Sequence, residues 1–369
     1  MSVFSLHTEI HTGAKALDVM NQFRDMRVLI VTDAFLAGTD LFRDVKARLG
    51  TRVTVFDEVT PNPTIQLVGK GAACYLAADP EVVVALGGGS PIDAAKAMHK
   101  AALAVGEGAR EGLVVIPTTS GSGSEVTSYA VITDENTHAK IPMVSQDLVP
   151  RLAILDPRAV VGVPPKVTAD SGMDVLTHAV EAYVSHEAGD FSDACAEKSV
   201  QLLCAHLGTC YADGTNLESR RRMHNASTLA AIAFNNAGLG ITHSLAHALG
   251  GRYPVAHGRL NAMLLPHVMA YNAERSQRAS RKYAWLAHLT GHSGGGSVKA
   301  AVVSFVGAID RLRASLDIPT RLADEGVSPV DLRSSLDDLA TVAMADGCTP
   351  GNPVAPTHAD LVGLLRHLV

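Results

Sequence analysis

The chain has 369 residues, of which 47% are hydrophobic and 18% are charged, and its formal net charge is −6 at pH 7. This length is large for one hydrophobic core, so we expect two domains, and the composition is that of a well-packed globular protein, not a disordered one. The acidic balance gives no reason to expect a nucleic acid as partner, and no apolar run is long enough to cross a membrane.

The first part of the chain alternates short β-branched runs with stretches of helical spacing. Strands are predicted at residues 27–32, 52–57, 82–86, 113–118 and 152–156, and helices between them at 65–78 and 91–105. Strands that are apolar throughout and separated by helices indicate a parallel sheet that is buried on both faces. Residues 1–160 are therefore predicted to form an α/β domain of the nucleotide-binding type, built on a parallel sheet.

The β-branched runs stop at the proline-rich turn formed by Pro164 and Pro165. Helices are predicted beyond it at 168–186, 190–211, 218–237, 241–250, 260–290, 296–315 and 329–344. Residues 161–369 are therefore predicted to form an all-α domain. The five cysteines include no C-x-x-C pair, which is typical of reduced thiols in a cytoplasmic protein.

A glycine-rich turn follows the predicted strand at 82–86, in the sequence VVVALGGGSPIDAAKA. Three consecutive glycines let the backbone turn sharply and approach a ligand closely. Ser90 is expected to cap the next helix, and Asp93 completes an S-x-x-D capping pattern. The free N–H groups and the positive dipole end of that helix favour a pyrophosphate, although a tight glycine turn without a ligand explains the same residues.

A second loop of small residues, IPTTSGSGSEVTSYAVIT at 116–133, follows the next strand and is rich in hydroxyl groups. Two such loops at neighbouring strand ends are able to close over one dinucleotide. Asp33, directly after the strand at 27–32, is placed to hold a ribose 2′-hydroxyl, which favours NAD over NADP. Alternatively, Asp33 caps the next helix.

Two pairs of side chains in the helical half are spaced as metal ligands on one helix face. Asp174 and His178 are four residues apart, and His243 and His247 repeat that spacing. His257 follows on a segment predicted to be a loop. One carboxylate and imidazoles from two separate segments indicate a site for a divalent first-row ion, with zinc and iron(II) both suited to it.

These motifs occur together in the order found in a known family. GGGSPIDAAKA, TTSGSGSEVT, GMDVLTHAVEAY and the H-x3-H-x9-H stretch before GRLNAMLLPHV resemble the iron-containing (group III) alcohol dehydrogenases over nearly the whole chain. Within that family, FSLHTEIHTG, VTADSGMDVLTHAVEAYVS and MHNASTLAAIAF are similar to the branch that forms 1-propanol in propanediol-utilising bacterial microcompartments.

The resemblance implies a set of site residues. Asp174, His178, His243 and His257 would be the metal ligands, and His247 would be the catalytic residue beside the nicotinamide. NAD is the implied cofactor, with Fe2+ as the metal and Zn2+ as the other possibility. The implied cofactor-binding residues are Asp33, Asn62, Gly88, Gly89, Ser90, Thr118, Thr119, Ser122, Val131 and Lys140.

The implied reaction is hydride transfer between NAD(H) and a short primary alcohol or aldehyde such as 1-propanol or propanal. A homodimer or larger homo-oligomer is implied as well, in the cytoplasm and inside a microcompartment, with a CoA-acylating aldehyde dehydrogenase as partner. Two departures from the family pattern, Ala248 and Arg259, flank the site and bear on the fit of the substrate.

Three other functions stay open at this point. The first is a metal- and NAD-dependent lyase or cyclase resembling dehydroquinate synthase, which needs a basic pocket for an acidic substrate. The second is a reductase of hydroxy-acid or semialdehyde substrates, which Arg259 would favour. The third is a non-catalytic scaffold partner, which would not need complete metal and cofactor sites.

Overall fold

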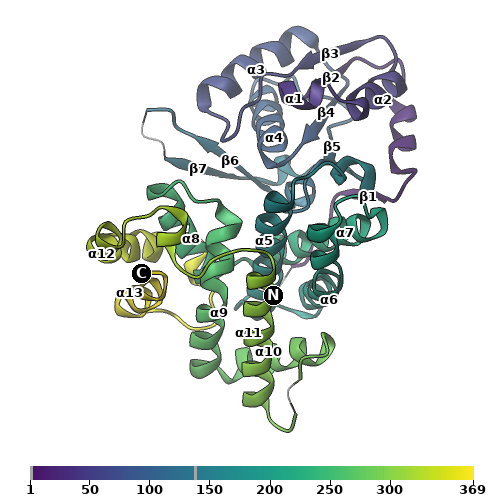
Figure 1. Cartoon of the computed structure of the whole chain (residues 1–369). Coiled ribbons are helices and arrows are strands. Elements are labelled where there is room, and N and C mark those ends of the chain that lie inside the picture. The colour runs from purple at the N-terminus through teal and green to yellow at the C-terminus, as the bar shows by residue number, and fades with distance from the viewer. Residues whose placement is uncertain (1–2, 137–138, 294) are drawn as a thin grey trace. The chain divides into compact units, whose positions relative to one another are not determined.

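The computed structural model describes residues 3–136, 139–293 and 295–369, and its helices and strands are labelled in Figure 1. These residues divide into two compact units. The α/β unit comprises Ser5–Val163 and Thr215–Thr228, and the helical unit is made mainly of Pro164–Gly214 and Leu229–Val369. An α/β part with a parallel sheet and an all-helical part were both predicted from the sequence.

The α/β unit is built on a six-stranded sheet in the order β1-β8-β5-β4-β2-β3, with every neighbouring pair parallel. Its strands are β1 (Glu9–Thr12), β2 (Val28–Val31), β3 (Val53–Phe56), β4 (Val82–Gly87), β5 (Leu113–Pro117) and β8 (Leu152–Leu155). The predicted parallel sheet is confirmed, and all the strands except β1 were predicted.

Both faces of this sheet are buried, because successive residues of each strand pack on opposite sides. On β2, Val28 and Ile30 join the core beneath the 3-10 helix η1 (Ala16–Phe23) and α2 (Asp40–Leu49). The alternate residues Leu29 and Val31 join the core beneath α3 and α4. The other α-helices described within Ser5–Val163 are α1 (Ala34–Ala37), α3 (Ile65–Ala78) and α4 (Gly89–Ala104).

An antiparallel hairpin of β6 (Tyr129–Thr133) and β7 (Lys140–Val144) stands apart from the main sheet and was not predicted. Most of the β7 residues are exposed, so the strand lacks the continuous apolar run that marks the buried strands.

The helical unit consists of helices that were mostly predicted in place. They are α5 (Pro165–Val184), α6 (Asp190–Ala212), the later part of α7 (Leu217–Ala237), α8 (Ile241–Arg252), α9 (His257–Arg275), α10 (Gln277–Leu289), α11 (Val298–Ser315), α12 (Pro329–Ala345) and α13 (His358–Leu365). The single helix predicted at 260–290 is wrong, because Ser276 ends α9 and its hydroxyl caps α10 by accepting from Ala279 N. The prediction of a loop at His257 is also wrong, because this residue begins α9.

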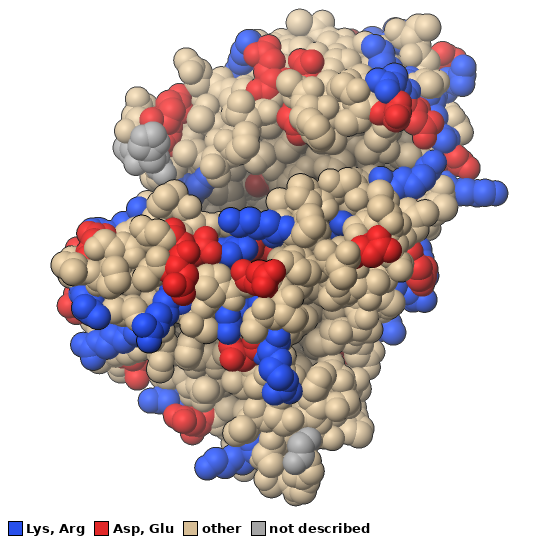
Figure 2. All heavy atoms as spheres, in the orientation of Figure 1, with Lys and Arg blue, Asp and Glu red and all other residues tan. Residues whose placement is uncertain are grey.

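On the face drawn in Figure 2, basic and acidic side chains are interspersed among a majority of other residues. Among the described helices, none combines the length and the apolar composition that a membrane span requires.

The predicted capping of α4 by Ser90 and Asp93 is wrong. Gly88 occupies the N-cap position of α4 and provides no side-chain cap. The Asp93 carboxylate instead accepts hydrogen bonds from Ser124 Oγ at 2.8 Å and from Val131 N at 3.0 Å. Asp93 therefore ties α4 to the loop after β5 and to β6.

A fully buried lysine completes this connection. Lys96 Nζ donates to the carbonyl oxygens of Thr127 and Tyr129, both at 2.7 Å. Burial lowers the pKa of Lys96 to about 8, while the negative charges of Asp93 and Glu125 act in the opposite direction. The ammonium group therefore stays charged at neutral pH and balances buried carboxylates around the hairpin.

We predict that Lys96→Met destabilises the protein by about 3–5 kcal/mol, because it leaves buried carboxylates and two carbonyls without their partner. Lys100→Met, one turn further along α4, is the matched control, because Lys100 pairs with the half-exposed Asp147. Its expected cost is below about 1 kcal/mol. Urea unfolding of both variants measures the difference, and equal costs would contradict a special role for Lys96.

Candidate metal centre and cofactor-binding surface

Helix α5 carries two of the predicted ligands into the interior of the helical unit. It starts with Pro165 in its first turn and is buried along nearly its whole length. Asp174 and His178 lie one turn apart on it, with only 8% and 6% of their surface exposed. Buried ionisable groups need a partner, so this pair marks a site on α5.

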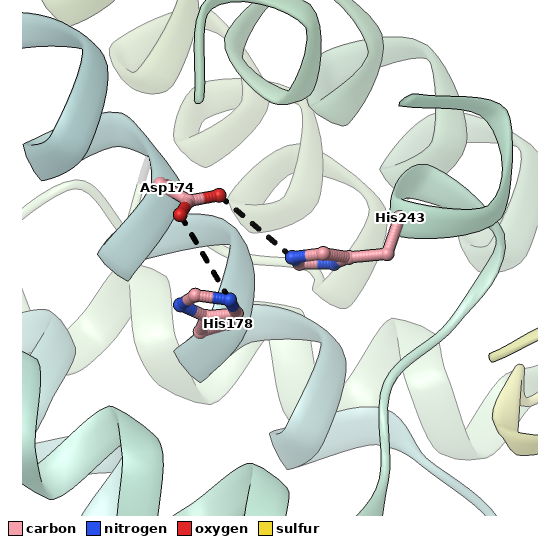
Figure 3. A group of neighbouring side chains, drawn as sticks. All are labelled: Asp174, His178 and His243. Atoms are coloured by element: carbon pink, nitrogen blue, oxygen red, sulfur yellow. Dashed lines mark ion pairs between the residues drawn. The ribbon is translucent and has the colours of Figure 1, made fainter. Parts of the chain in front are cut away.

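A third predicted ligand, His243 of α8, faces the same point and is 1% exposed. Figure 3 shows Asp174 with one carboxylate oxygen directed to His178 and the other to His243. The distances are 4.0 Å from His178 Nε2 to Asp174 Oδ2 and 3.8 Å from His243 Nε2 to Asp174 Oδ1. One ligand atom of each residue lies within 4.8 Å of those of the other two.

The fourth predicted ligand, His257, lies at the edge of this cluster. Its Nε2 is 3.5 Å from Asp174 Oδ1, and its side chain is 40% exposed. The next residue, Gly258, lets α9 touch α5 at this point, because a Cβ there would lie 2.0 Å from the carbonyl oxygen of Asp170. Only glycine fits this approach without moving one of the two helices.

The cluster fits a divalent cation. Separations of 3.5–4.0 Å are too long for hydrogen bonds but similar to the roughly 3.4 Å between neighbouring ligand atoms around a tetrahedral zinc-like ion. His243 Nε2 is buried and has no hydrogen-bond partner among the described residues. Burial lowers the pKa of both His178 and His243, so both rings are neutral at neutral pH, the form that binds metals.

A buried carboxylate that was not predicted orients His243. Glu181 lies on α5, and its Oε2 accepts from His243 Nδ1 at 2.6 Å and from Gly240 N at 2.9 Å. Its Oε1 accepts from Thr242 N at 2.6 Å. With the proton held on Nδ1, His243 presents the lone pair of Nε2 to Asp174 and His178, as in carboxylate–histidine–metal arrangements. The i, i+7 spacing from Asp174 was the only sequence signal for Glu181.

His247, predicted to be catalytic, lies one turn beyond His243 and is 44% exposed. Its ring stacks on that of His257, with centroids 5.2 Å apart and an interplanar angle of 14°. Its Nδ1 is 2.9 Å from Asp346 Oδ2, and Cys348 lies in the same small cluster. Neither Asp346 nor Cys348 was singled out from the sequence, because they lie about a hundred residues away on a short turn.

Arg259, one of the two departures from the family pattern, is engaged within the helical unit. Its Nε donates to Asp170 at 2.9 Å, and its Nη1 donates to Glu325 at 2.7 Å. The guanidinium group is almost completely buried between these carboxylates. Arg259 therefore links α9 to α5 and offers no free positive charge to a substrate carboxylate.

The predicted cofactor residues all belong to the α/β unit, and most of them follow the carboxyl ends of β2, β4 and β5. Strand β2 pairs with β3 on one side and with β4 on the other, which makes the β2–β4 boundary a topological switch point. Thr32 Oγ1 donates to Leu86 O at 2.8 Å and joins the two strand ends there. Asp33 follows β2 and caps α1, accepting from Leu36 N at 2.9 Å.

The two small-residue loops lie against each other at the start of α4. A Cβ on Gly88 would be 3.3 Å from the Thr119 side chain, and one on Gly89 would be 3.4 Å from Ser122. Thr118 N donates to Gly87 O at 2.9 Å and fixes the second loop to the end of β4. The N–H groups at the start of α4 are left without a side-chain cap, as an anion-binding helix start requires.

The other predicted cofactor residues continue this surface. Asn62 N donates to Ser90 Oγ at 3.3 Å. Lys140 Nζ donates to Asn62 Oδ1 at 2.5 Å and to Thr133 Oγ1 at 3.0 Å. Val131 lies beside them on β6 and is 39% exposed. The structure therefore brings these residues together in one region of the α/β unit.

Comparison with known proteins identifies relatives along the whole chain. A family model described as iron-containing alcohol dehydrogenase matches residues 7–157, and one described as the C-terminal part of the Fe-containing alcohol dehydrogenase family matches residues 168–369. The chain is 41% identical over 365 residues to the 1-propanol dehydrogenase PduQ of Salmonella typhimurium strain LT2, and the match covers 98% of both chains.

Two further relatives agree with this match. The NAD-dependent methanol dehydrogenase of Bacillus methanolicus is 35% identical, with 94% of this chain and 93% of that one covered. The crystal structure of a 1,3-propanediol oxidoreductase superposes with a TM-score of 0.93 at 34% identity and covers 100% of both chains. From its two family matches and these full-length relatives, the chain belongs to the iron-containing alcohol dehydrogenase family and is an alcohol/aldehyde oxidoreductase.

Proposed function

We propose that this oxidoreductase is an NAD(H)- and metal-dependent reductase of short aldehydes, with propanal to 1-propanol as its reaction. The observation that carries the proposal is the buried group of Asp174, His178 and His243, with the unpartnered His243 Nε2, in a chain 41% identical to a 1-propanol dehydrogenase. The direction agrees with the microcompartment resemblance, in which reduction of an aldehyde regenerates NAD for a CoA-acylating aldehyde dehydrogenase.

Asp174, His178, His243 and His257 are the proposed ligands of a divalent ion, Fe2+ or Zn2+. When bound, such an ion supplies a Lewis acid for the oxygen of the substrate. The protein itself holds the three imidazoles neutral, contributes one negative charge through Asp174 and orients His243 through Glu181. His247 is the proposed proton donor to the alcohol oxygen, because it is the most exposed of the clustered histidines.

NAD is the proposed cofactor, held on the surface around the switch point of the α/β unit. The pyrophosphate would occupy the uncapped start of α4 beside Gly88, Gly89 and Thr119. Asp33 would hold the adenosine ribose, since one of its oxygens caps α1 and the other is not used by that cap. The similarity to the NAD-dependent methanol dehydrogenase of Bacillus methanolicus supports NAD as the cofactor.

The substrate proposed is small and uncharged, because the basic groups near the metal cluster are already paired. Arg259 is held by Asp170 and Glu325, and Arg252 pairs with Asp331 at 3.1 Å. A dehydroquinate synthase-like activity, or preference for hydroxy acids and semialdehydes, would need a free cation. A homodimer or larger assembly in the cytoplasm, inside a microcompartment, belongs to the same proposal.

The first prediction concerns the reaction itself. We expect the protein to oxidise NADH when propanal is supplied. This activity should be lost when a chelator removes the metal, and it should return when Fe2+ or Zn2+ is added back. A panel of propanal, acetaldehyde, lactaldehyde and succinic semialdehyde fixes the substrate class. A specificity constant for either of the last two well above that of propanal would overturn the short-aldehyde proposal and leave the metal and NAD proposals standing.

The second prediction concerns metal retention. Glu181→Gln replaces one accepting oxygen with an amide group that donates. At least one of the three N–H groups that now donate to Glu181 then faces another donor, and His243 is less well oriented. Affinity for Zn2+ is expected to fall about 10- to 100-fold. Glu197→Gln is the matched control, because Glu197 also accepts a short hydrogen bond beside α5, from Tyr183. Competition with a chromogenic chelator measures both, and equal affinities would count against the role of Glu181.

The third prediction separates two roles of Asp33. Asp33→Gly removes both the cap and the charge, whereas Asp33→Ser keeps a capping hydroxyl and removes only the charge. Both variants are expected to lower the preference for NADH over NADPH at least about tenfold, equivalent to about 1.4 kcal/mol. The ratio of the two specificity constants is the measurement. A ratio unchanged in both variants would show that Asp33 is only a helix cap.

A further inference from the structure

The carboxylate of Asp346 receives hydrogen bonds from three sides. Asp346 ends α12 as its C-cap residue, and its Oδ1 accepts from Cys348 N at 2.8 Å and lies 3.3 Å from Ser244 Oγ. Its other oxygen, Oδ2, is 2.9 Å from His247 Nδ1. Ser244 is itself held by Thr349, whose hydroxyl oxygen is 2.8 Å away. The carboxylate therefore has a fixed orientation between α8 and the turn after α12.

This orientation decides which nitrogen of His247 carries a proton. The backbone N–H of Cys348 can only donate, so Oδ1 is committed to that side and Oδ2 must face the imidazole. An ionised carboxylate can only accept, so the hydrogen bond requires a proton on His247 Nδ1. Burial opposes the charged form of Asp346, but the hydrogen bond from His247 and the amide of Cys348 hold its pKa at about 2.

The opposite nitrogen, Nε2, is then the one left to exchange a proton. His247 lines a cavity of about 390 Å³ together with Leu339 and Val342 of α12, so the ring is reached by water from this side. Its other neighbour is the His257 ring, on which it stacks. Among the described residues, none forms a hydrogen bond with His247 Nε2, whereas Nδ1 is hydrogen-bonded to Asp346.

We infer that Asp346 is a positioning residue that holds His247 with a proton on Nδ1, so that Nε2 gives the proton to the alcohol oxygen. The inference rests on the proposed role of His247 and deepens it. In the step, the N–H bond at Nε2 breaks and an O–H bond forms on the product, while the hydrogen bond to Asp346 keeps the other ring proton on Nδ1. His247 then regains its proton from solvent. The same division of roles is known for the aspartate of Ser-His-Asp hydrolases.

Asp346→Asn tests this because it reverses the hydrogen bond without removing the side chain. The amide oxygen must take the place of Oδ1, since Cys348 N–H still needs an acceptor there. The NH2 group then faces His247 Nδ1 and donates to it, which moves the ring proton to Nε2 and leaves Nδ1 as an acceptor.

Four variants give the decisive comparison: Asp346→Asn, Asp346→Ala, His247→Ala and the double variant His247→Ala/Asp346→Asn. Asp346→Asn is expected to lower kcat for propanal reduction about 100-fold, within the usual range of general acid catalysis. Asp346→Ala is expected to lower kcat less, because the ring then samples both tautomers, although it costs more thermal stability. In the His247→Ala background, Asp346→Asn is expected to change kcat no further.

A purely structural role predicts the opposite order of kcat, with Asp346→Ala slower than Asp346→Asn. Asp331→Asn is the matched control. Asp331 also lies on α12 and joins it to the end of α8 by hydrogen bonds with Arg252 and Tyr253, but it does not contact His247. It is expected to keep its kcat. Bound metal and KM for NADH are expected to stay within about twofold of the parent in all the Asp346 variants.

The possible outcomes distinguish an error in the proposed function of His247 from an error in the role of Asp346. If His247→Ala keeps the parent kcat, the proposed function of His247 is wrong and the inference falls with it. If His247→Ala is slow but Asp346→Asn is no slower than Asp346→Ala, or lowers kcat further in the double variant, only the role of Asp346 is overturned. Nitrogen-15 NMR of the ring, assigned by its loss in His247→Ala, adds a direct readout: the Nδ1–H tautomer in the parent and the Nε2–H tautomer in Asp346→Asn.

Discussion

The hydrogen bonds that Glu181 accepts are the interaction on which the metal cluster depends. Helix α8 begins after Gly240, which has no side chain to cap it, so its first amides need acceptors from elsewhere. Glu181 of α5 accepts from two of these amides and from the His243 ring. A Cβ on Gly240 would lie 3.0 Å from Glu181 Oε1, so glycine leaves the room for this contact. The position of His243 is thereby set by the helix that carries Asp174 and His178.

A second charged contact fixes the remaining ligand-bearing helix in the same way. Arg259, two residues after His257, reaches back to Asp170 on α5 and outward to Glu325. The two ion pairs compensate for the hydration that the guanidinium group loses on burial, so its burial is favourable only where both carboxylates are present. The residue that departs from the family pattern is therefore part of the framework of the site and not of its substrate surface. Helices α8 and α9, which follow each other in the sequence, are thereby both joined to the earlier helix α5.

Much of this architecture follows from the sequence, because the buried strands and helices carry strong periodic signals. The strands β2, β4 and β5 are apolar throughout, and the pairs Asp174/His178 and His243/His247 repeat at helical spacing. The start of α9 at His257 and the cap of α4 depend on tertiary contacts that compete with local preference. The role of Asp346 could not be predicted from the sequence for the same reason, since only the fold brings its short turn to His247. Nor does any local signal show that Thr215–Thr228 packs with the α/β unit.

The edge strand β1 has a consequence for how the chain is made. It pairs with β8 alone, in a register that joins Glu9 to Leu152, and Thr8 Oγ1 donates to Pro150 O across 142 positions. The strands β2 and β3, and likewise β4 and β5, are neighbours both in the chain and in the sheet, but β1 must wait for the whole remainder of the sheet. At about 5–20 residues per second, that wait lasts roughly 7–30 s. For that interval the segment before η1 is an unpaired strand, so docking of β1 on β8 closes the sheet last although it is synthesised first.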